Sequence, residues 1–398
     1  MAIVITGASG FVGRNIIPEL KKAGEQLLLV GRNVEQLRKQ YPYAEVTSYD
    51  QFSSAARGYD TLVHLAVLNN NKDGSLEQFR KVNVELLKNV VDQAILAGVK
   101  TLIYTSTLLA DNSANSSHYV QSKREADEFL QKVNGLAVVK LKLPSVYGAT
   151  FAGKLRVLNK IPGLLRPAAF DVLASFKPTV RADCVAQAIL VFAGTRENSE
   201  QILSDKQFGN FFYAFINRSM DLVFAGTIIV FFWWFLLLVW LVVKITSPGP
   251  GILSQVRVGK DEKHIVLYKF RTMKEGTKQL ASHEIGKASI TKTGHILRKT
   301  KIDELPQVLN ILKNEMSLVG PRPCLPVQEE LIAARKKRGI LNIKCGITGL
   351  AQVQGVDMEN VERLVGIEEE YIARRTLLLD IKIILATAIG SGQGDRVR

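Results

Sequence analysis

A tyrosine and a lysine are spaced so that they would share one face of a helix. Tyr119 and Lys123 lie four residues apart in YVQSK, and positions i and i+4 of a helix are neighbours. A nearby ammonium and the positive charge of a cofactor would lower the pKa of the phenol, which could then exchange a proton with a carbonyl oxygen. Ser106 or Thr107, at the end of an apolar run, would hydrogen-bond the same oxygen. The set indicates acid–base chemistry at a carbonyl group.

A glycine-rich turn near the N-terminus could hold a cofactor. Gly7, Gly10 and Gly13 have the spacing GxxGxxG, between an apolar run and a helical pattern. Such a turn binds pyrophosphate, because the backbone can approach it closely and the helix N-terminus attracts negative charge. Arg32 ends the second apolar run, where a carboxylate would favour NAD and a cation favours the 2′-phosphate of NADP. We predict NADP(H); if Arg32 is only a solvated surface residue, NAD is the alternative.

Two adjacent carboxylates, Asp303 and Glu304, lie among many cations in the second half of the chain. Adjacent side chains on a helix point in different directions, so one could face a reacting phosphorus and the other a metal or a structural partner. Carboxylate, cations and Mg²⁺ are what phosphoryl transfer needs, because developing negative charge must be neutralised. Helix capping is the structural alternative for such a pair. The cations nearby in sequence are Lys269, Arg271, Arg298, Lys299, Lys301 and Arg322.

Strands and helices alternate in the first half of the chain. Helical stretches separate most of the apolar runs, and this alternation predicts an α/β fold with a Rossmann-like, doubly wound parallel sheet. The second half is expected to contain a strand and a helix that begins near Asp303. The predicted strands are 2–6, 27–31, 61–66, 101–106, 136–143 and 264–273, and the predicted helix is 299–326.

The run from Leu222 to Val243 contains no charged residue. As a helix of 22 residues it would be about 33 Å long, close to the thickness of a bilayer core. Membrane insertion is therefore predicted, and the core helix of a soluble domain is the alternative. If both halves use cytosolic substrates, the run must enter and return as a re-entrant helix or lie in the interface. The predicted parts are a first domain (1–203), a linker (204–219), the membrane helix (220–246) and a second domain (247–398).

The charge is unevenly distributed. The formal net charge is +15, and residues 246–346 contain 19 Lys and Arg against nine Asp and Glu. A basic region after a membrane segment indicates contact with anionic lipid headgroups or phosphate substrates. Nucleic acid is not expected, because the chain has no recognisable nucleic-acid motif. Cys184, Cys324 and Cys345 are far apart in sequence and are interpreted as reduced thiols of a cytosolic compartment, and no cleavable signal peptide is expected.

Residues 1–203 resemble the extended short-chain dehydrogenase/reductase family, in its sugar-nucleotide epimerase/dehydratase branch. The resemblance implies a nicotinamide cofactor held at Gly7, Gly10 and Gly13. It also implies a proton-transfer set of Tyr119, Lys123 and either Ser106 or Thr107. The substrate lobe after VYG is shorter here than is usual in this branch. The matching pieces are TGASGFVG, HLA (64–66), KVNVE, YTST, YVQSK, LPSVYG and VRADCVAQAI.

Residues from about 217 onward resemble the bacterial sugar transferases, the monotopic phosphoglycosyl transferases. The resemblance implies Mg²⁺-dependent transfer of a phosphosugar from a UDP-sugar to polyprenyl (undecaprenyl) phosphate. Asp303 would be the covalent nucleophile and Glu304 its partner at the metal or the acceptor. The shared pieces are SPGP, QVRVG, YKFRTM, DELPQ, MSLVGPRP and CGITGLAQVQG, and the cations implied to hold phosphates are Lys269, Arg271, Arg298 and Arg322.

The membrane helix departs from this family in one respect. Members usually carry a Ser-Pro pair in its middle, where this chain has Trp233-Trp234. These tryptophans could lie at a bend, but the sequence has no proline there that would kink the helix. The C-terminal run 377–389 is too short and too charged to span, and fits an interfacial helix.

Together, these patterns predict a bifunctional monotopic enzyme of surface glycan biosynthesis, with both domains on the cytoplasmic face of the bacterial inner membrane. The first domain is predicted to be an NADPH-dependent reductase of a 4-keto sugar nucleotide. The alternatives are an epimerase or dehydratase, or a non-catalytic nucleotide-binding regulatory module. A further alternative is that the second half is only a basic membrane anchor. The sugar, the polyprenol and the oligomeric state, including a homodimer, stay open.

Overall fold

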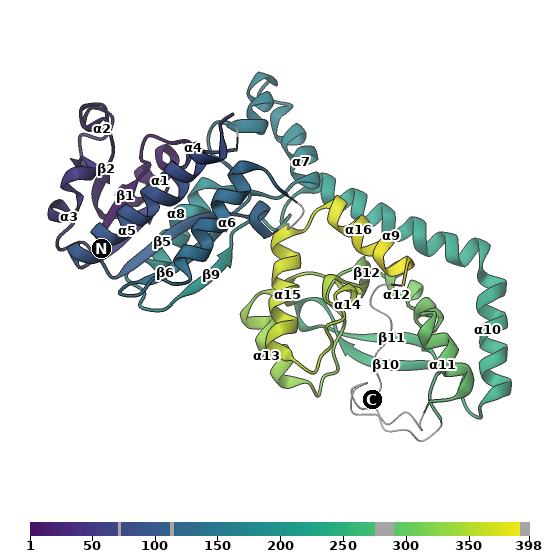
Figure 1. Cartoon of the computed structure of the whole chain (residues 1–398). Coiled ribbons are helices and arrows are strands. Elements are labelled where there is room, and N and C mark those ends of the chain that lie inside the picture. Colours follow the sequence, from purple (N-terminus) through teal and green to yellow (C-terminus); the bar gives the residue numbers. More distant parts are fainter. Residues whose placement is uncertain (71–72, 112–114, 275–289, 391–398) are drawn as a thin grey trace. The chain divides into compact units, whose positions relative to one another are not determined.

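The chain forms two compact units (Figure 1). The computed structural model describes residues 1–70, 73–111, 115–274 and 290–390. The first unit comprises Met1–Phe170 and Lys177–Asp205, and the second comprises Asp171–Phe176 and the chain from Lys206 onward.

The first unit is built on a parallel sheet of seven strands, in the order β3-β2-β1-β4-β5-β6-β9. The chain crosses from β3 back to β4 beside β1, which is the doubly wound topology expected from the sequence. The short outer strands β3 and β9 were not predicted. The strands are β1 (Ala2–Thr6), β2 (Gln26–Val30), β3 (Glu45–Thr47), β4 (Thr61–His64), β5 (Thr101–Thr107), β6 (Ala137–Leu143) and β9 (Ser199–Ile202).

Helices cover both faces of this sheet. Side chains of β1 alternate between the two cores: Ile3 and Ile5 pack with α1 and α8, and Val4 packs with α5 and α6. This alternation follows from the period of two in a strand. The helices are α1 (Phe11–Lys22), α2 (Val34–Gln40), α3 (Phe52–Ala55), α4 (Leu76–Arg80), α5 (Leu86–Ala97), α6 (His118–Leu130), α7 (Arg166–Phe176, which continues into the second unit) and α8 (Ala182–Phe192). A separate parallel pair joins β7 (Ser145–Tyr147) and β8 (Thr179–Arg181).

Two apolar helices begin the main part of the second unit. Helix α9 (Phe211–Phe231) starts inside the segment expected to be a linker, because the Asn210 side chain caps it by accepting from the Tyr213 amide. Phe232 (φ −118°, ψ 12°) separates α9 from α10 (Trp233–Thr246), and Figure 1 shows a bend where they meet. Among the described residues, α9 is the one helix long and apolar enough to cross a membrane.

The rest of the second unit combines two small sheets with short helices. Strands β10 (Ile252–Val258) and β11 (His264–Phe270) are antiparallel, and β12 (Met316–Val319) and β13 (Cys345–Thr348) are parallel. A 3₁₀ helix (Ile302–Gln307) leads into α12 (Val308–Leu312). The other helices are α11 (Lys292–Lys299), α13 (Glu329–Lys337), α14 (Leu350–Val353), α15 (Val361–Arg374) and α16 (Leu377–Ala388).

The predicted helix over 299–326 is wrong in its second half. Helical structure ends at Leu312, and Asn314 takes a left-handed φ of 64°. Residues 316–319 then form β12, whose ladder partner β13 lies far along the chain. Local pattern could not show that partner, because the strand depends on long-range pairing.

Candidate functional sites

The glycine turn after β1 leaves no room for side chains. Gly7 has a φ of 78°, and a Cβ there would lie 2.5 Å from the backbone of Leu65 and Ala66 after β4. A Cβ on Gly13, in α1, would lie 2.7 Å from the Gly7 carbonyl oxygen. The Gly10 amide donates to that same oxygen (2.9 Å) and precedes the helix N-terminus. This cradle fits the pyrophosphate of a nicotinamide dinucleotide.

Arg32 lies just beyond the carboxyl end of β2 and is exposed. Asn33 follows it and caps α2 by accepting from the Gln36 amide (3.0 Å). Burial raises the pKa of Tyr49, and the Arg32 charge partly opposes that rise. The guanidinium is therefore near the strand ends and open to solvent, where a ribose substituent could reach it.

The YxxxK pair lies on α6, but its two side chains have different partners. The Lys123 ammonium is buried and donates to the Tyr104 hydroxyl (2.9 Å) and the Thr105 carbonyl (2.7 Å) on β5. The Tyr119 hydroxyl is hydrogen-bonded to Thr107. Thr107, rather than Ser106, is thus the residue joined to the phenol.

Burial controls the protonation of this set. Burial raises the pKa of Tyr119 to about 12, although the hydrogen bond with Thr107 partly opposes this rise. Burial also lowers the pKa of Lys123 to about 8, although Asp127 opposes the change. The Lys123 ammonium points at β5 and does not offset the effect of burial on Tyr119. A lowering by the ammonium together with the positive charge of a bound cofactor stays a prediction. A phenol that is protonated at neutral pH suits a proton donor to an oxygen that gains charge.

Two residues of this site were missed in the sequence. Ser106 donates to Asp127 Oδ2 (3.0 Å), and Tyr104 receives the Lys123 hydrogen bond. Asp127 continues the i, i+4 series of Tyr119 and Lys123, which was a usable signal. Tyr104 could not be found this way, because its contact depends on how α6 lies against β5.

The carboxylates of the second unit are buried in the 3₁₀ helix. Asp303 and Glu304 are 7% and 8% exposed, and Glu304 Oε1 accepts from Arg322 Nη2 at 2.9 Å. Burial and the Glu304 charge raise the pKa of Asp303 to about 7. The charges that oppose this rise belong to Lys269, Arg298 and Arg322. The structure therefore brings the carboxylates close to three of the cations that were named from the sequence.

Two arginines offer buried hydrogen-bond donors. Arg271 Nη2 donates to the Ser247 carbonyl (2.6 Å) of the SPGP turn, and Arg298 Nε donates to Thr272 Oγ1 (2.9 Å). Arg271 Nε and Nη1 and Arg298 Nη1 are buried and have no hydrogen-bond partner in the described part of the chain. Guanidinium groups with open donors suit phosphate oxygens.

The carboxylates are also candidate ligands for a metal ion. No group of three or more His, Cys, Asp or Glu side chains gathers within the described ranges. Mg²⁺ is commonly held by one or two carboxylates together with substrate phosphates. Asp303 and Glu304 fit that mode of binding, in which the substrate completes the site.

The chain matches two family models. Residues 212–392 match the family described as bacterial sugar transferase. Residues 3–172 match the NAD dependent epimerase/dehydratase family. The glycine cradle and YxxxK set lie in the second of these matches, and Asp303 and its cations lie in the first.

The curated relatives match through the second half. The chain is 38% identical over 181 residues to UDP-glucose:undecaprenyl-phosphate glucose-1-phosphate transferase of Escherichia coli K12, covering 43% of this chain and 39% of that protein. It is 34% identical over 193 residues to exopolysaccharide production protein PSS of Rhizobium leguminosarum bv. phaseoli, covering 44% of this chain and 94% of that protein. The chain thus spans less than half of the E. coli relative. A solved UDP-glucose 4-epimerase of Thermotoga maritima is 19% identical, with a TM-score of 0.41, over 51% of this chain and 77% of that one.

Proposed function

This chain belongs to the bacterial sugar transferase family, and we propose that its second unit transfers a sugar phosphate from a UDP-sugar to polyprenyl phosphate. The observation that carries the proposal is the buried Asp303–Glu304 pair facing Lys269, Arg298 and Arg322. A carboxylate nucleophile needs such cations, because negative charge accumulates on the transferring phosphoryl group. The name of the E. coli relative supports undecaprenyl phosphate as the acceptor.

The proposed reaction has two displacements at one phosphorus. An Asp303 carboxylate oxygen forms a bond to the β-phosphorus of the UDP-sugar, and the bond from that phosphorus to the bridging oxygen breaks, so that UMP leaves with the electron pair. A phosphate oxygen of the polyprenyl phosphate then attacks the same phosphorus and releases the carboxylate. Mg²⁺, held by Asp303 and Glu304 with the substrate phosphates, would neutralise charge in both steps.

The side chains around Asp303 have separate tasks in this scheme. Arg322 fixes Glu304 through their ion pair and adds positive charge next to the nucleophile. Arg271 and Arg298, each anchored through one donor, offer their open donors to phosphate oxygens. A pKa of about 7 leaves a large fraction of Asp303 ionised at neutral pH.

A transfer assay tests this proposal. The purified protein in lipid nanodiscs receives Mg²⁺, undecaprenyl phosphate and either UDP-glucose or UDP-N-acetylgalactosamine, the donors named for curated relatives. We expect UMP release and a lipid-linked sugar phosphate with at least one donor, and neither product with Asp303→Asn. Asp261→Asn, at an exposed turn, is the matched control and should retain parent activity. Full activity of Asp303→Asn would contradict the proposal.

For the first unit we propose NADPH-dependent reduction of a 4-keto sugar nucleotide. The protonated Tyr119 phenol would donate to the carbonyl oxygen as hydride arrives at the carbon, with Thr107 bonded to the phenol. The glycine cradle would hold the cofactor and Arg32 its 2′-phosphate. A transferase in the same chain would use the product directly, which favours a last-step reductase over an epimerase.

Absorbance of reduced nicotinamide separates these alternatives. With a UDP-linked 4-keto-6-deoxy-2-acetamido sugar, we expect stoichiometric loss of NADPH that Tyr119→Phe abolishes. Tyr43→Phe, at an exposed tyrosine, is the control. Interconversion of two hydroxyl sugars without net NADPH loss would show an epimerase. Cofactor binding without any turnover would show a regulatory module.

The apolar helices favour a monotopic location on the cytoplasmic face of the bacterial inner membrane. Many of their apolar side chains are exposed, which is costly in water and favourable in a bilayer. They include Val223, Val230, Phe231, Trp233, Trp234, Leu237 and Leu241. The bend at Phe232 supports a helix that enters and returns, because cytosolic UDP-sugar and nicotinamide must reach both units.

A further inference from the structure

Helix α9 carries a buried carboxylate and an arginine one turn apart. Asp221 is 1% exposed and Arg218 is 27% exposed, and their charged atoms lie 3.9 Å apart. Asp221 directly precedes the exposed apolar residues Leu222 and Val223. A buried carboxylate in an apolar helix is costly unless it is hydrogen-bonded, so its partners show what the position is for.

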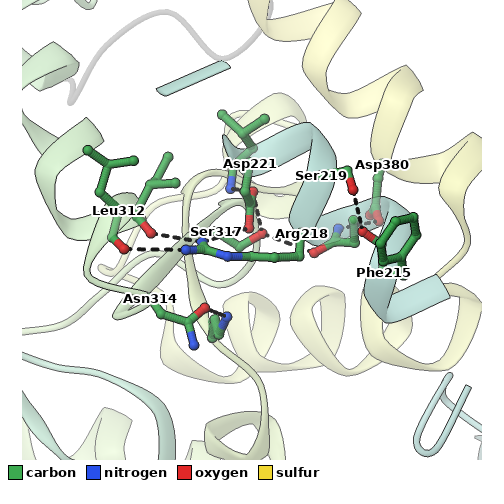
Figure 2. A network of polar contacts seen from close by, with 12 residues as sticks. Phe215, Arg218, Ser219, Asp221, Leu312, Asn314, Ser317 and Asp380 are labelled. Carbon is green, nitrogen blue, oxygen red and sulfur yellow. Dashed lines mark hydrogen bonds and ion pairs between the residues drawn. The ribbon is translucent and has the colours of Figure 1, made fainter. Parts of the chain in front are cut away.

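Asp221 holds strand β12. Its Oδ1 accepts from the Leu318 amide (2.7 Å) and from Ser317 Oγ (3.0 Å), as Figure 2 shows for Ser317. Because β12 pairs with β13 alone in its two-stranded sheet, one of its edges has no strand to supply acceptors, and the carboxylate takes that place. Four residues beyond Leu318 the chain reaches Arg322, which binds Glu304.

Arg218 holds helix α12. Its Nη1 donates to the Ile311 carbonyl (2.8 Å) and its Nη2 to the Leu312 carbonyl (3.3 Å), contacts drawn in Figure 2. These carbonyls end α12, where a cation is favourable because the helix dipole leaves partial negative charge there. The other end of α12 continues directly from the 3₁₀ helix that contains Asp303 and Glu304.

The two contacts close a ring of structure around the site. One side runs from Arg218 through α12 to Glu304, and the other runs from Asp221 through β12 to Arg322. The Glu304–Arg322 ion pair joins the two sides. We infer that Arg218 and Asp221 are positioning residues of the transferase site, which set the spacing between the carboxylates and Arg322 from the membrane helix. This inference rests on the proposed transferase function.

Steady-state kinetics of the full-length protein in nanodiscs test the inference. UDP-glucose and UDP-N-acetylgalactosamine serve as donors with undecaprenyl phosphate and Mg²⁺. We expect Asp221→Ala and Arg218→Ala to lower kcat by about 10- to 100-fold, with the donor KM changed by less than about threefold, because small misplacement of reacting groups slows chemistry more than binding. Membrane-bound yield and thermal midpoint, measured on the same samples, report folding.

Conservative and control variants separate positioning from general damage. Asp221→Asn keeps an oxygen that can accept from the Leu318 amide, and should recover most of the kcat lost in Asp221→Ala. Ser317→Ala removes one of the two hydrogen bonds to Asp221, together with a longer one to Asn217 (3.4 Å), and should give a smaller loss in a normally folded protein. Ser219→Ala is the matched control, because its hydroxyl donates only locally to the Phe215 carbonyl (2.9 Å; Figure 2). Parent kcat in Asp221→Ala and Arg218→Ala, or equal losses in Asp221→Asn and Asp221→Ala, would overturn the inference.

Hydrogen exchange keeps the inference testable apart from the proposed function. We expect amides of residues 302–307 and 316–322 to exchange at least about tenfold faster in Asp221→Ala than in the parent or Ser219→Ala, because the ring is opened there. If the parent transfers no sugar phosphate but Asp221→Ala still exchanges faster than the parent in these segments, the proposed function is contradicted and the positioning role of Asp221 still holds. Unchanged exchange in both segments would overturn the positioning role of Asp221 itself.

Discussion

Asp303 is a carboxyl group whose ionisation opposes folding. Its pKa rises from 3.8 to about 7 through burial and the Glu304 charge. Since the unfolded chain gives up this proton near pH 4 and the folded chain keeps it to about pH 7, stability falls as the pH rises through this window. The proposed nucleophile is held in an environment that suits reaction more than stability.

Asp303→Asn should therefore stabilise the protein above pH 7 and do so less as the pH falls towards 4. The expected gain is on the order of 1–4 kcal/mol at pH 8, because the amide never has to ionise. Thermal unfolding in detergent at pH 5 and pH 8 measures it, with Asp261→Asn as the control at an exposed position. An identical difference between variant and parent at both pH values would contradict the environment described for Asp303.

Residue spacing predicted which side chains share a helix face but not where they point. Tyr119 and Lys123 do lie on one helix, as YxxxK indicated. The direction of the ammonium is set by Tyr104 and Thr105 on β5. Such contacts join segments distant in sequence, so only the packed structure could supply them.

Among the elements, the apolar helices α9 and α10 show what the sequence could and could not predict. An uncharged run predicted one long apolar helix, whereas the structure has α9 and α10 with a break at Phe232. No proline is present at the break, so the bend was predicted from the location of the substrates and from the family resemblance, and not from the residues at that point. Likewise, β12 was mistaken for helix because its ladder partner is β13 and the edge that faces α9 is held by Asp221.

The bend predicts that both units face one side of the membrane. Glu197→Cys in the first unit and Lys260→Cys in the second are exposed positions, and each can be combined with Cys184→Ser, since the other cysteines are buried. In intact spheroplasts, an impermeant maleimide should label neither position, and both should react after the membrane is opened. Labelling of only one position before opening would mean that the helix spans the bilayer.

At the scale of the whole molecule, the two units carry the residues of two separate proposed chemistries. The first holds the glycine cradle and the Tyr119–Lys123 set, and the second holds Asp303 and its cations. Composition and motifs already divided the chain in this way, since each motif lies inside one unit. The sugar that would link the two proposed activities depends on pocket shape, which residue spacing does not encode.

Inactivating one unit should leave the chemistry of the other intact. Tyr119→Phe should abolish NADPH consumption and keep at least about half of the parent transfer rate when finished donor is supplied, because neither catalytic set uses residues of the other. Asp303→Asn should do the reverse. Both rates are measured on the same preparations. Loss of both activities in either variant would show that the two sites depend on each other.

The most direct test of the account is to look for the covalent intermediate. The protein is incubated with Mg²⁺ and UDP-glucose or UDP-N-acetylgalactosamine without polyprenyl phosphate, quenched and digested, and the peptide containing Asp303 is analysed by mass spectrometry. We predict UMP release of up to one equivalent per chain and a phosphosugar mass increase on Asp303, which disappears when undecaprenyl phosphate is added. An adduct on another residue, or UMP release that requires the lipid and leaves no adduct, would contradict Asp303 as the nucleophile.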